Sequence, residues 1–168
     1  ASLPADTNIN FFKKYSSIAE QDAINFIYST IPALQVVPPK IQTSTRGTST
    51  KDNNEDSIDV VLILDSFVDS RIFEWIRSFV RDFILELDID SGQWRIGVFT
   101  IASGNKVDFQ LNRYIYRAET IEAVNRIRHQ NIRGRPDVAG AFDYVRSTMF
   151  TSTNGDRPQA RNFVILLT

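Results

Sequence analysis

The run Ile58–Asp65 constrains the fold more than any other part of the chain. It reads Ile-Asp-Val-Val-Leu-Ile-Leu-Asp and is nearly all apolar, as in a strand that is covered on both faces. An amphipathic run follows within residues 71–88, which indicates a helix directly after the strand. A strand that ends in an acid and passes into a helix places Asp65 at the carboxyl end of a sheet, where open α/β folds build their ligand sites.

Composition is that of a soluble globular protein. Hydrophobic residues make up 42% and charged residues 23% of the 168 positions, and the net charge is −1. A balance so close to neutral predicts neither nucleic acid nor an anionic membrane as a partner. No stretch approaches the ~20 apolar residues of a membrane span. The absence of cysteine excludes disulfides and thiolate metal sites.

Residues 1–57 divide into two segments. Apolar residues recur at helical spacing within 1–41, and Ser17-Ile-Ala-Glu20 fits a capping box, so we expect a helical N-terminal extension whose helix runs from about Ile18 to Ile31. Residues 42–57 carry no apolar side chain and predict a flexible linker. The chain begins at Ala1 without a basic and apolar leader, which suits a processed, secreted protein.

From Ile58 onward, strand and helix patterns alternate. The expected order is strand, helix, strand, hairpin strand, two helices, strand, which predicts an α/β fold with a doubly wound, mostly parallel sheet and helices on both faces. Trp75 and Trp94 lie within apolar periodicity and are predicted to be core residues. The apolar stripe of the first helix is predicted to comprise Ile72, Trp75 or Ile76, Phe79, Phe83 and Leu87.

Residues 58–168 resemble a von Willebrand factor type A domain. The resemblance depends on the strand Ile58–Asp65, on Arg95-Ile-Gly-Val98, on Phe109-Gln-Leu-Asn112, and on Gly134 followed by Ala141-Phe-Asp-Tyr-Val145. It implies that the second half of the family fold lies beyond Thr168. The apolar strand 163–167 would then form an unpaired sheet edge. We therefore expect a longer chain, a larger oligomer or a second chain that completes the sheet.

The resemblance also implies a metal-ion-dependent adhesion site, which the sequence alters. The family loop reads Asp-x-Ser-x-Ser, and Asp65 matches its aspartate, whereas Phe67 and Asp69 replace the two serines. Pro136 stands where the family has a ligating Thr. We expect a degenerate site that binds no metal, with Ca²⁺ or Mg²⁺ on Asp65 and Asp69 as the alternative. Arg133 or Arg135 is predicted to pair with Asp65 or Asp69 in place of the ion, beneath Phe67.

A basic cluster is the second candidate site. Arg126, Arg128, Arg133 and Arg135 are candidates for binding an acidic protein partner or a sulfated glycan, because guanidinium groups hold carboxylate and sulfate at two points. The alternative is a solvated loop with cations near a helix C-terminus. His129, the single histidine, is predicted to be a surface residue.

The chain carries none of the short motifs that identify common enzyme classes. Together with the resemblance, this predicts a non-enzymatic, extracellular, secreted interaction or structural module of a matrix or adhesion assembly. Its expected partners are proteins, among them collagen-like or other matrix proteins, or sulfated glycans. The alternatives are a metal-dependent adhesion domain with an altered site and a non-catalytic subunit of an intracellular complex.

Overall fold

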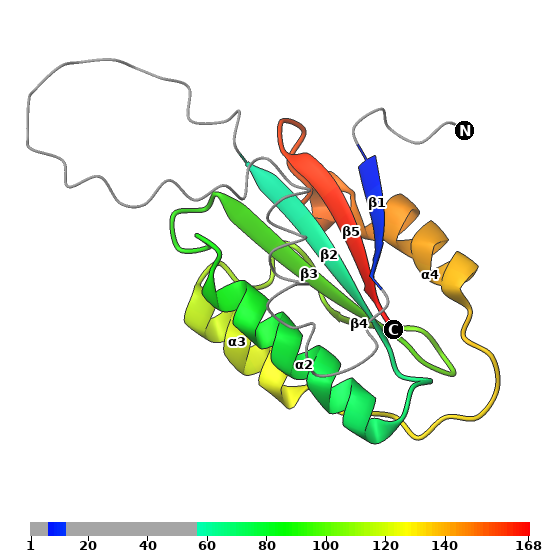
Figure 1. Cartoon of the computed structure of the whole chain (residues 1–168). Coiled ribbons are helices and arrows are strands. Elements are labelled where there is room, and N and C mark those ends of the chain that lie inside the picture. The colour runs from blue at the N-terminus through cyan, green and yellow to red at the C-terminus, as the bar shows by residue number, and fades with distance from the viewer. Residues whose placement is uncertain (1–6, 13–56) are drawn as a thin grey trace, which may run out of the picture.

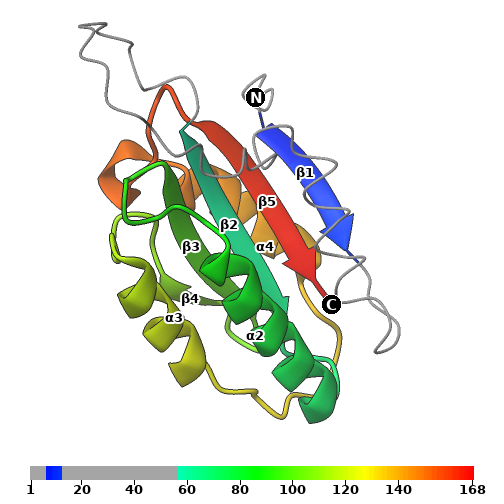
Figure 2. The ribbon, with the colours of Figure 1, turned by 60° about the vertical axis from the view of Figure 1, so that its left-hand side comes forward.

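The computed structural model describes residues 7–12 and 57–168, which form one twisted sheet with helices on both faces (Figures 1 and 2). The strands follow the order β1-β5-β2-β3-β4, and all neighbours are parallel except β3 and β4. The elements are β1 (Thr7–Phe12), β2 (Ile58–Asp65), α2 (Ser70–Leu85), β3 (Trp94–Ile101), β4 (Lys106–Phe109), α3 (Arg117–Arg126), α4 (Val138–Tyr144), which continues into a π-helical turn (Val145–Met149), a 3₁₀ turn (Ser152–Asn154) and β5 (Arg161–Leu167). The mostly parallel α/β fold predicted from the sequence is confirmed.

Alternating side chains of β2 supply two separate cores. The even-numbered residues from Ile58 to Leu64 pack in the cluster that α2 and α3 cover. Val61 and Ile63 pack in a second cluster with Ala141, Val145 and Met149 from the α4 side. Every residue of β2 is buried, as expected for a strand that helices cover on both faces.

The buried stripe of α2 differs from the predicted one at its first turn. Phe73, Ile76, Phe79 and Phe83 are buried, but Ile72 is 37% and Trp75 45% exposed. The helix begins at Ser70, with Asp69 as its N-cap, and in its first turns Phe73 and Ile76 face the sheet in place of Ile72 and Trp75. The prediction that Trp75 is a core residue was wrong, whereas Trp94 at 4% exposure is in the core as predicted.

The sheet edges correct two expectations. β5 does not form an edge, because β1 pairs with it in parallel from Thr7↔Asn162 to Phe12↔Leu167. Residues Thr7–Phe12, which fall in the predicted helical N-terminal extension 1–41, therefore form a strand. The predicted helix 18–31 and residues 42–56 of the predicted linker lie outside the described residues. Ser57 is part of the folded domain, since it is 6% exposed and its carbonyl accepts from the Arg161 amide at 2.9 Å.

A buried ion pair closes the amino end of β2. Asp59 is fully buried, and its carboxylate accepts from the backbone amide of Arg157 at 2.7 Å and from the Arg157 Nε at 2.9 Å. The same guanidinium donates to the carbonyls of Ile58 at 2.9 Å and Gln93 at 3.0 Å. Burial raises the pKa of the Asp59 carboxyl, although hydrogen bonds and charge attraction from Arg157 act in the opposite direction. The Asp59–Arg157 contact at the amino end of the sheet is structural, which leaves the carboxyl end as the place for a functional site.

Candidate functional site

Asp65 lies at the carboxyl end of β2 and already uses both of its oxygens. The residue is 5% exposed. Its Oδ1 accepts from the Phe67 amide at 2.8 Å, and its Oδ2 accepts from the Thr168 hydroxyl at 2.7 Å. β2 and β5 are adjacent and parallel, so their ends meet at the same edge of the sheet and bring Thr168 to Asp65. Both donors are neutral, and the carboxylate has no ion-pair partner among the described residues.

Asp69 has a different local role. It is exposed, and its Oδ1 accepts from the Arg71 amide at 2.8 Å, which caps the first turn of α2. Asp65 and Asp69 thus serve two separate backbone turns. Within residues 57–168, no group of three or more His, Asp or Glu side chains is arranged to hold a metal ion.

The loop that follows α3 is fastened to the loop that follows β2. Ser66 is fully buried, and its hydroxyl accepts from the Gln130 amide at 2.8 Å. His129 places its Nε2 3.0 Å from the Val68 carbonyl and its ring 5.3 Å from that of Phe73. His129 is half-buried and holds the two loops together, so it lies at the surface but is not freely solvated.

Phe67 and the glycine of the second loop meet at this edge. The Phe67 ring packs against the core on the α4 side, and a Cβ built on Gly134 would lie 3.9 Å from its Cε1. Gly134 has φ 129°, a backbone conformation that other residues rarely adopt. The Phe67 side chain thus sits between the loop of Asp65 and the loop that carries Arg133 and Arg135.

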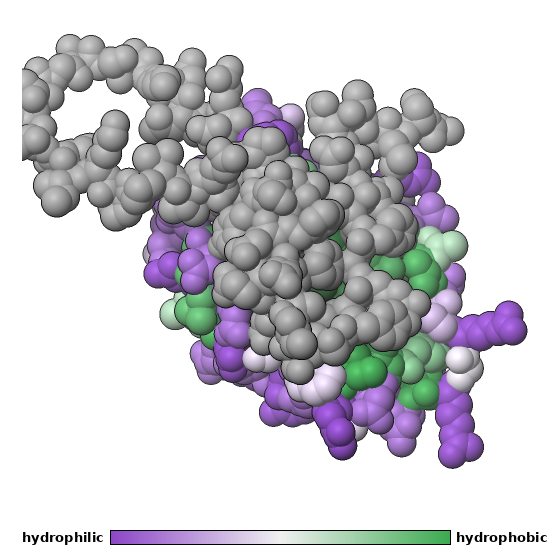
Figure 3. All heavy atoms as spheres, viewed as in Figure 1, coloured by the Kyte–Doolittle hydropathy of each residue, from purple (hydrophilic) through white to green (hydrophobic). Residues whose placement is uncertain are grey.

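The predicted pairing of these arginines with the aspartates is not formed. Arg133 and Arg135 are both exposed, and neither makes an ion pair with Asp65 or Asp69. The carboxylates are satisfied locally, by the Phe67 and Arg71 amides and the Thr168 hydroxyl, and this competes with an arginine partner. In Figure 3, long hydrophilic side chains project at the lower right margin, where the loop 127–137 runs in Figure 1.

The four predicted partner-binding arginines do not form one group. Arg126 pairs with Glu122 on the same helix and lines a pocket beside β4. Arg128 turns back to the end of α3, where its Nη1 donates to the Asn125 carbonyl at 2.7 Å. Only Arg133 and Arg135 stand free in the loop. Arg71, which the sequence analysis did not select, is exposed in the first turn of α2 beside Asp69, and its side chain has no partner among the described residues.

Comparison with known proteins assigns the chain to a family. Residues 59–168 match the family model of the von Willebrand factor type A domain. The chain belongs to this family. The resemblance read from the sequence is thereby confirmed, together with its extent.

Relatives of this type A domain include matrix and adhesion proteins. The chain is 30% identical over 112 residues to the collagen alpha-5(VI) chain of Mus musculus, which covers 66% of this chain and 4% of that protein. It is 26% identical over 146 residues to integrin alpha-2 of Bos taurus, with 84% and 12% covered. It is 33% identical over 116 residues to matrilin-3 of Gallus gallus, with 66% and 25% covered. The chain thus spans a quarter or less of these relatives.

Solved structures show the same fold. Proximal thread matrix protein 1 from the mussel byssus, in its form with a zinc-occupied MIDAS motif, superposes with a TM-score of 0.60 at 17% identity, over 67% of this chain and 31% of that one. At this identity the likeness shows the fold alone. The type A domain described here has no helix, in the part of the chain that the structure describes, that is long and apolar enough to cross a membrane.

Proposed function

We propose that this type A domain is a non-enzymatic, extracellular interaction module of a matrix or adhesion assembly, and that it binds its partner without a divalent cation. Similarity to proteins named as collagen, matrilin and integrin chains supports a role in a matrix or adhesion assembly. The expected partners are collagen-like or other matrix proteins or sulfated glycans. The contact that carries the proposal is the double hydrogen bond at Asp65, which engages both carboxylate oxygens.

The side chains at this edge support binding without a cation. Ca²⁺ takes about 6–8 oxygen ligands, and Mg²⁺ takes an octahedral set in which one or two carboxylates are joined by several waters. Phe67 and Pro136 offer no side-chain oxygen, Asp65 is engaged twice, and Asp69 caps α2. The residues present do not fit the hydroxyl-rich shell that the family pattern requires. The alternative is an altered Ca²⁺ or Mg²⁺ site formed by Asp65 and Asp69, which an experiment must exclude.

Exposed arginines supply positive charge at the same edge. We define the edge arginines as Arg71, Arg133 and Arg135. In a type A domain with a working site, the cation holds an acidic group of the partner, and a guanidinium can hold carboxylate or sulfate at two points instead. The loop of Arg133 and Arg135 is fixed at its start by Ser66 and His129, which lowers the entropy lost when it meets a ligand.

Calorimetric titration with Ca²⁺ and with Mg²⁺ tests the first half of this proposal. We expect no binding heat from either ion for the wild-type domain or for Asp65→Asn. A saturable heat that Asp65→Asn abolishes would establish the altered metal site and overturn metal-independent binding.

Binding to immobilised collagen and to a heparin-derived oligosaccharide, each in the presence of EDTA, tests the second half. We expect the double variant Arg133→Gln/Arg135→Gln to weaken binding to one of these ligands by about tenfold, because charge-assisted hydrogen bonds contribute most when both partners are ionised. Arg146→Gln, at an exposed arginine on the α4 side, is the matched control and should bind like the wild type. Equal binding by the double variant and the control would exclude Arg133 and Arg135 as binding residues.

A further inference from the structure

β4 presents a free sheet edge. It pairs with β3 alone among the described strands, in the antiparallel register Val98↔Phe109, Phe99↔Val107 and Thr100↔Lys106. The amide and carbonyl groups on its other side are therefore unpaired by any described strand, and such groups can receive an added strand from another protein. The edge strand Lys106–Phe109 is short, so main-chain pairing alone would give little affinity.

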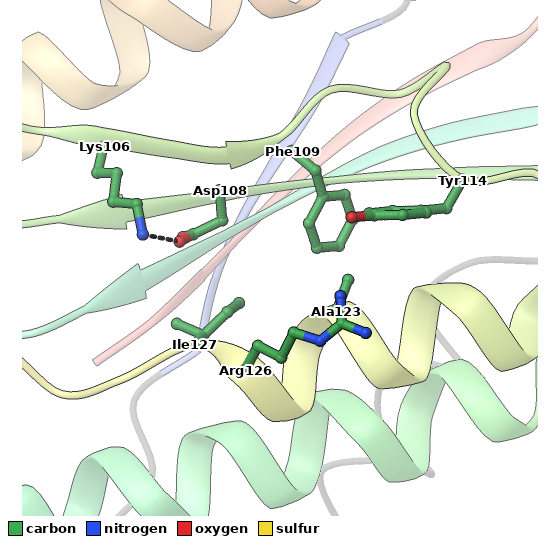
Figure 4. Close-up of a pocket in the computed structure, with 7 residues that line it drawn as sticks. All are labelled: Lys106, Asp108, Phe109, Tyr114, Ala123, Arg126 and Ile127. Carbon is green, nitrogen blue, oxygen red and sulfur yellow. Dashed lines mark ion pairs between the residues drawn. The ribbon is translucent and has the colours of Figure 1, made fainter.

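A pocket adjoins this edge and supplies a place for a side chain. It has a volume of about 160 Å³ and lies between β4 and the last turn of α3. Phe109 and Ile127, both 5% exposed, form apolar parts of its lining. Figure 4 shows Lys106 and Asp108 together on one side of the pocket and Tyr114 with Arg126 on the other.

The charges in the pocket favour an anion. Asp108 is already satisfied, since its side chain is 5% exposed and accepts from the Thr100 hydroxyl at 2.5 Å and from Lys106 at 3.0 Å. Lys106 and Arg126 are mostly exposed, at 57% and 66% of their side chains, so each can turn toward a ligand. The pair of Arg126 with Glu122 is equally exposed, and exposed pairs hold a guanidinium only weakly.

An ordered aromatic residue stands beside these cations. The Tyr114 ring meets the Phe109 ring edge-on at 5.1 Å, and the Arg113 guanidinium lies 5.3 Å from the Tyr114 ring centre. These two contacts fix the Tyr114 ring beside the pocket. The Tyr114 hydroxyl forms no hydrogen bond to any of the described residues. A fixed phenol and two mobile cations match a carboxylate on a short apolar stem.

We propose that β4 and this pocket form a second binding site, which takes an extended segment of a protein partner as an added strand. An acidic side chain of the segment enters the pocket and is held by Lys106, Arg126 and the Tyr114 hydroxyl. This site is separate from the edge arginines and does not depend on the function proposed for them.

Nuclear magnetic resonance with two capped synthetic peptides tests the proposal. One peptide alternates glutamate and threonine, and its twin has glutamine in place of glutamate. We expect the acidic peptide to shift the amide signals of residues 106–109 and to bind about tenfold more tightly than its twin, as expected for hydrogen bonds between ionised groups. Arg126→Gln should reduce this preference to about twofold, whereas Arg133→Gln/Arg135→Gln should leave it unchanged.

Three results would overturn the proposal. They are equal binding of the two peptides, shifts that avoid residues 106–109, and an unchanged preference in Arg126→Gln. A heparin-derived oligosaccharide that shifts the 106–109 signals when neither peptide does would replace the protein segment with a sulfated glycan. Arg126 is exposed, so its replacement is expected to leave the fold intact, which the dispersion of the same spectra checks.

Discussion

Each end of β2 carries a buried aspartate, and the two lie on the same face of the strand. Only Asp59 pairs with a cationic side chain. Asp59 meets Arg157 in an ion pair at 2.7 Å, and the guanidinium is anchored further by backbone carbonyls. Asp65, six positions along, accepts only from a neutral amide and a neutral hydroxyl. The amino end of the sheet is thus closed by matched charges. The carboxyl end keeps an unmatched carboxylate in the position where the family places its ligand site.

Arg157→Met is expected to have the largest effect on stability. It leaves the Asp59 carboxylate buried without its cation and removes the donor from two strand-end carbonyls. Breaking a buried pair in this way costs about 3–5 kcal/mol. Urea unfolding at neutral pH measures the loss, and Arg146→Met, at an exposed position, is the control that should change the free energy of unfolding by less than about 0.5 kcal/mol. Similar losses in both variants would show that the Asp59–Arg157 pair stabilises the fold no more than an exposed arginine does.

The pH dependence of stability in Arg157→Met tests further the contrast between Asp59 and Asp65. Burial raises the pKa of Asp59 above 3.8 even with Arg157 present, and without the cation it should rise further. The folded state then binds the proton more tightly than the unfolded state, so stability falls as pH rises from about 3.8 through the raised pKa. Arg157→Met should therefore recover stability on acidification relative to Asp59→Asn/Arg157→Met, by up to about 1.4 kcal/mol per pH unit. Parallel pH profiles of the two variants would contradict this assignment.

At the carboxyl end we expect a smaller effect. Thr168→Val removes the hydroxyl that donates to the buried Asp65 carboxylate, and a hydrogen bond to a charged group contributes about 1.5–3 kcal/mol. Thermal unfolding monitored by circular dichroism measures the change, with Thr153→Val at an exposed position as the control. A loss as large as that of Arg157→Met would place structural importance at both ends of the strand.

Arg133→Gln/Arg135→Gln should have the smallest effect on stability. Both side chains are exposed and make no ion pair, so the free energy of unfolding should change by less than about 0.5 kcal/mol. A loss of more than about 1.5 kcal/mol would show that these arginines stabilise the fold and are not available to bind a ligand.

Local patterns predicted the elements of the domain well but missed contacts between distant parts of the chain. The strands Ile58–Asp65 and Trp94–Ile101 follow from their apolar runs, and the strand predicted at 163–167 begins two residues earlier, at Arg161. The start of α3 depends on such a contact, because the amide of its first residue, Arg117, donates at 2.8 Å to the carboxylate of Asp90, which lies 27 positions earlier.

The candidate site was predictable in position but not in arrangement. Asp65 and Asp69 lie where the strand-to-helix junction placed them. The hydrogen bond from Thr168 joins residues 103 positions apart, and that from Gln130 joins residues 64 positions apart. Neither contact can be predicted from residue spacing or composition. An arginine was therefore predicted as the partner of Asp65, whereas the structure has the Thr168 hydroxyl in that place. The exposure of Trp75 was missed because Trp75 and Ile76 both fit the apolar spacing, and periodicity alone does not decide which of two adjacent apolar residues faces the sheet.

The position of β5 between β1 and β2 has a consequence for how the domain folds. β2, β3 and β4 are contiguous in sequence and can assemble early, but β2 then keeps one bare edge until a strand about one hundred positions later reaches it, as in the pairing Leu62↔Ile165. Closing such long loops before any contact is gained makes folding slow. A ribosome-bound chain that has emerged only as far as α4 would expose the apolar edge of β2, and this interval is when the protein is most open to aggregation or to a chaperone.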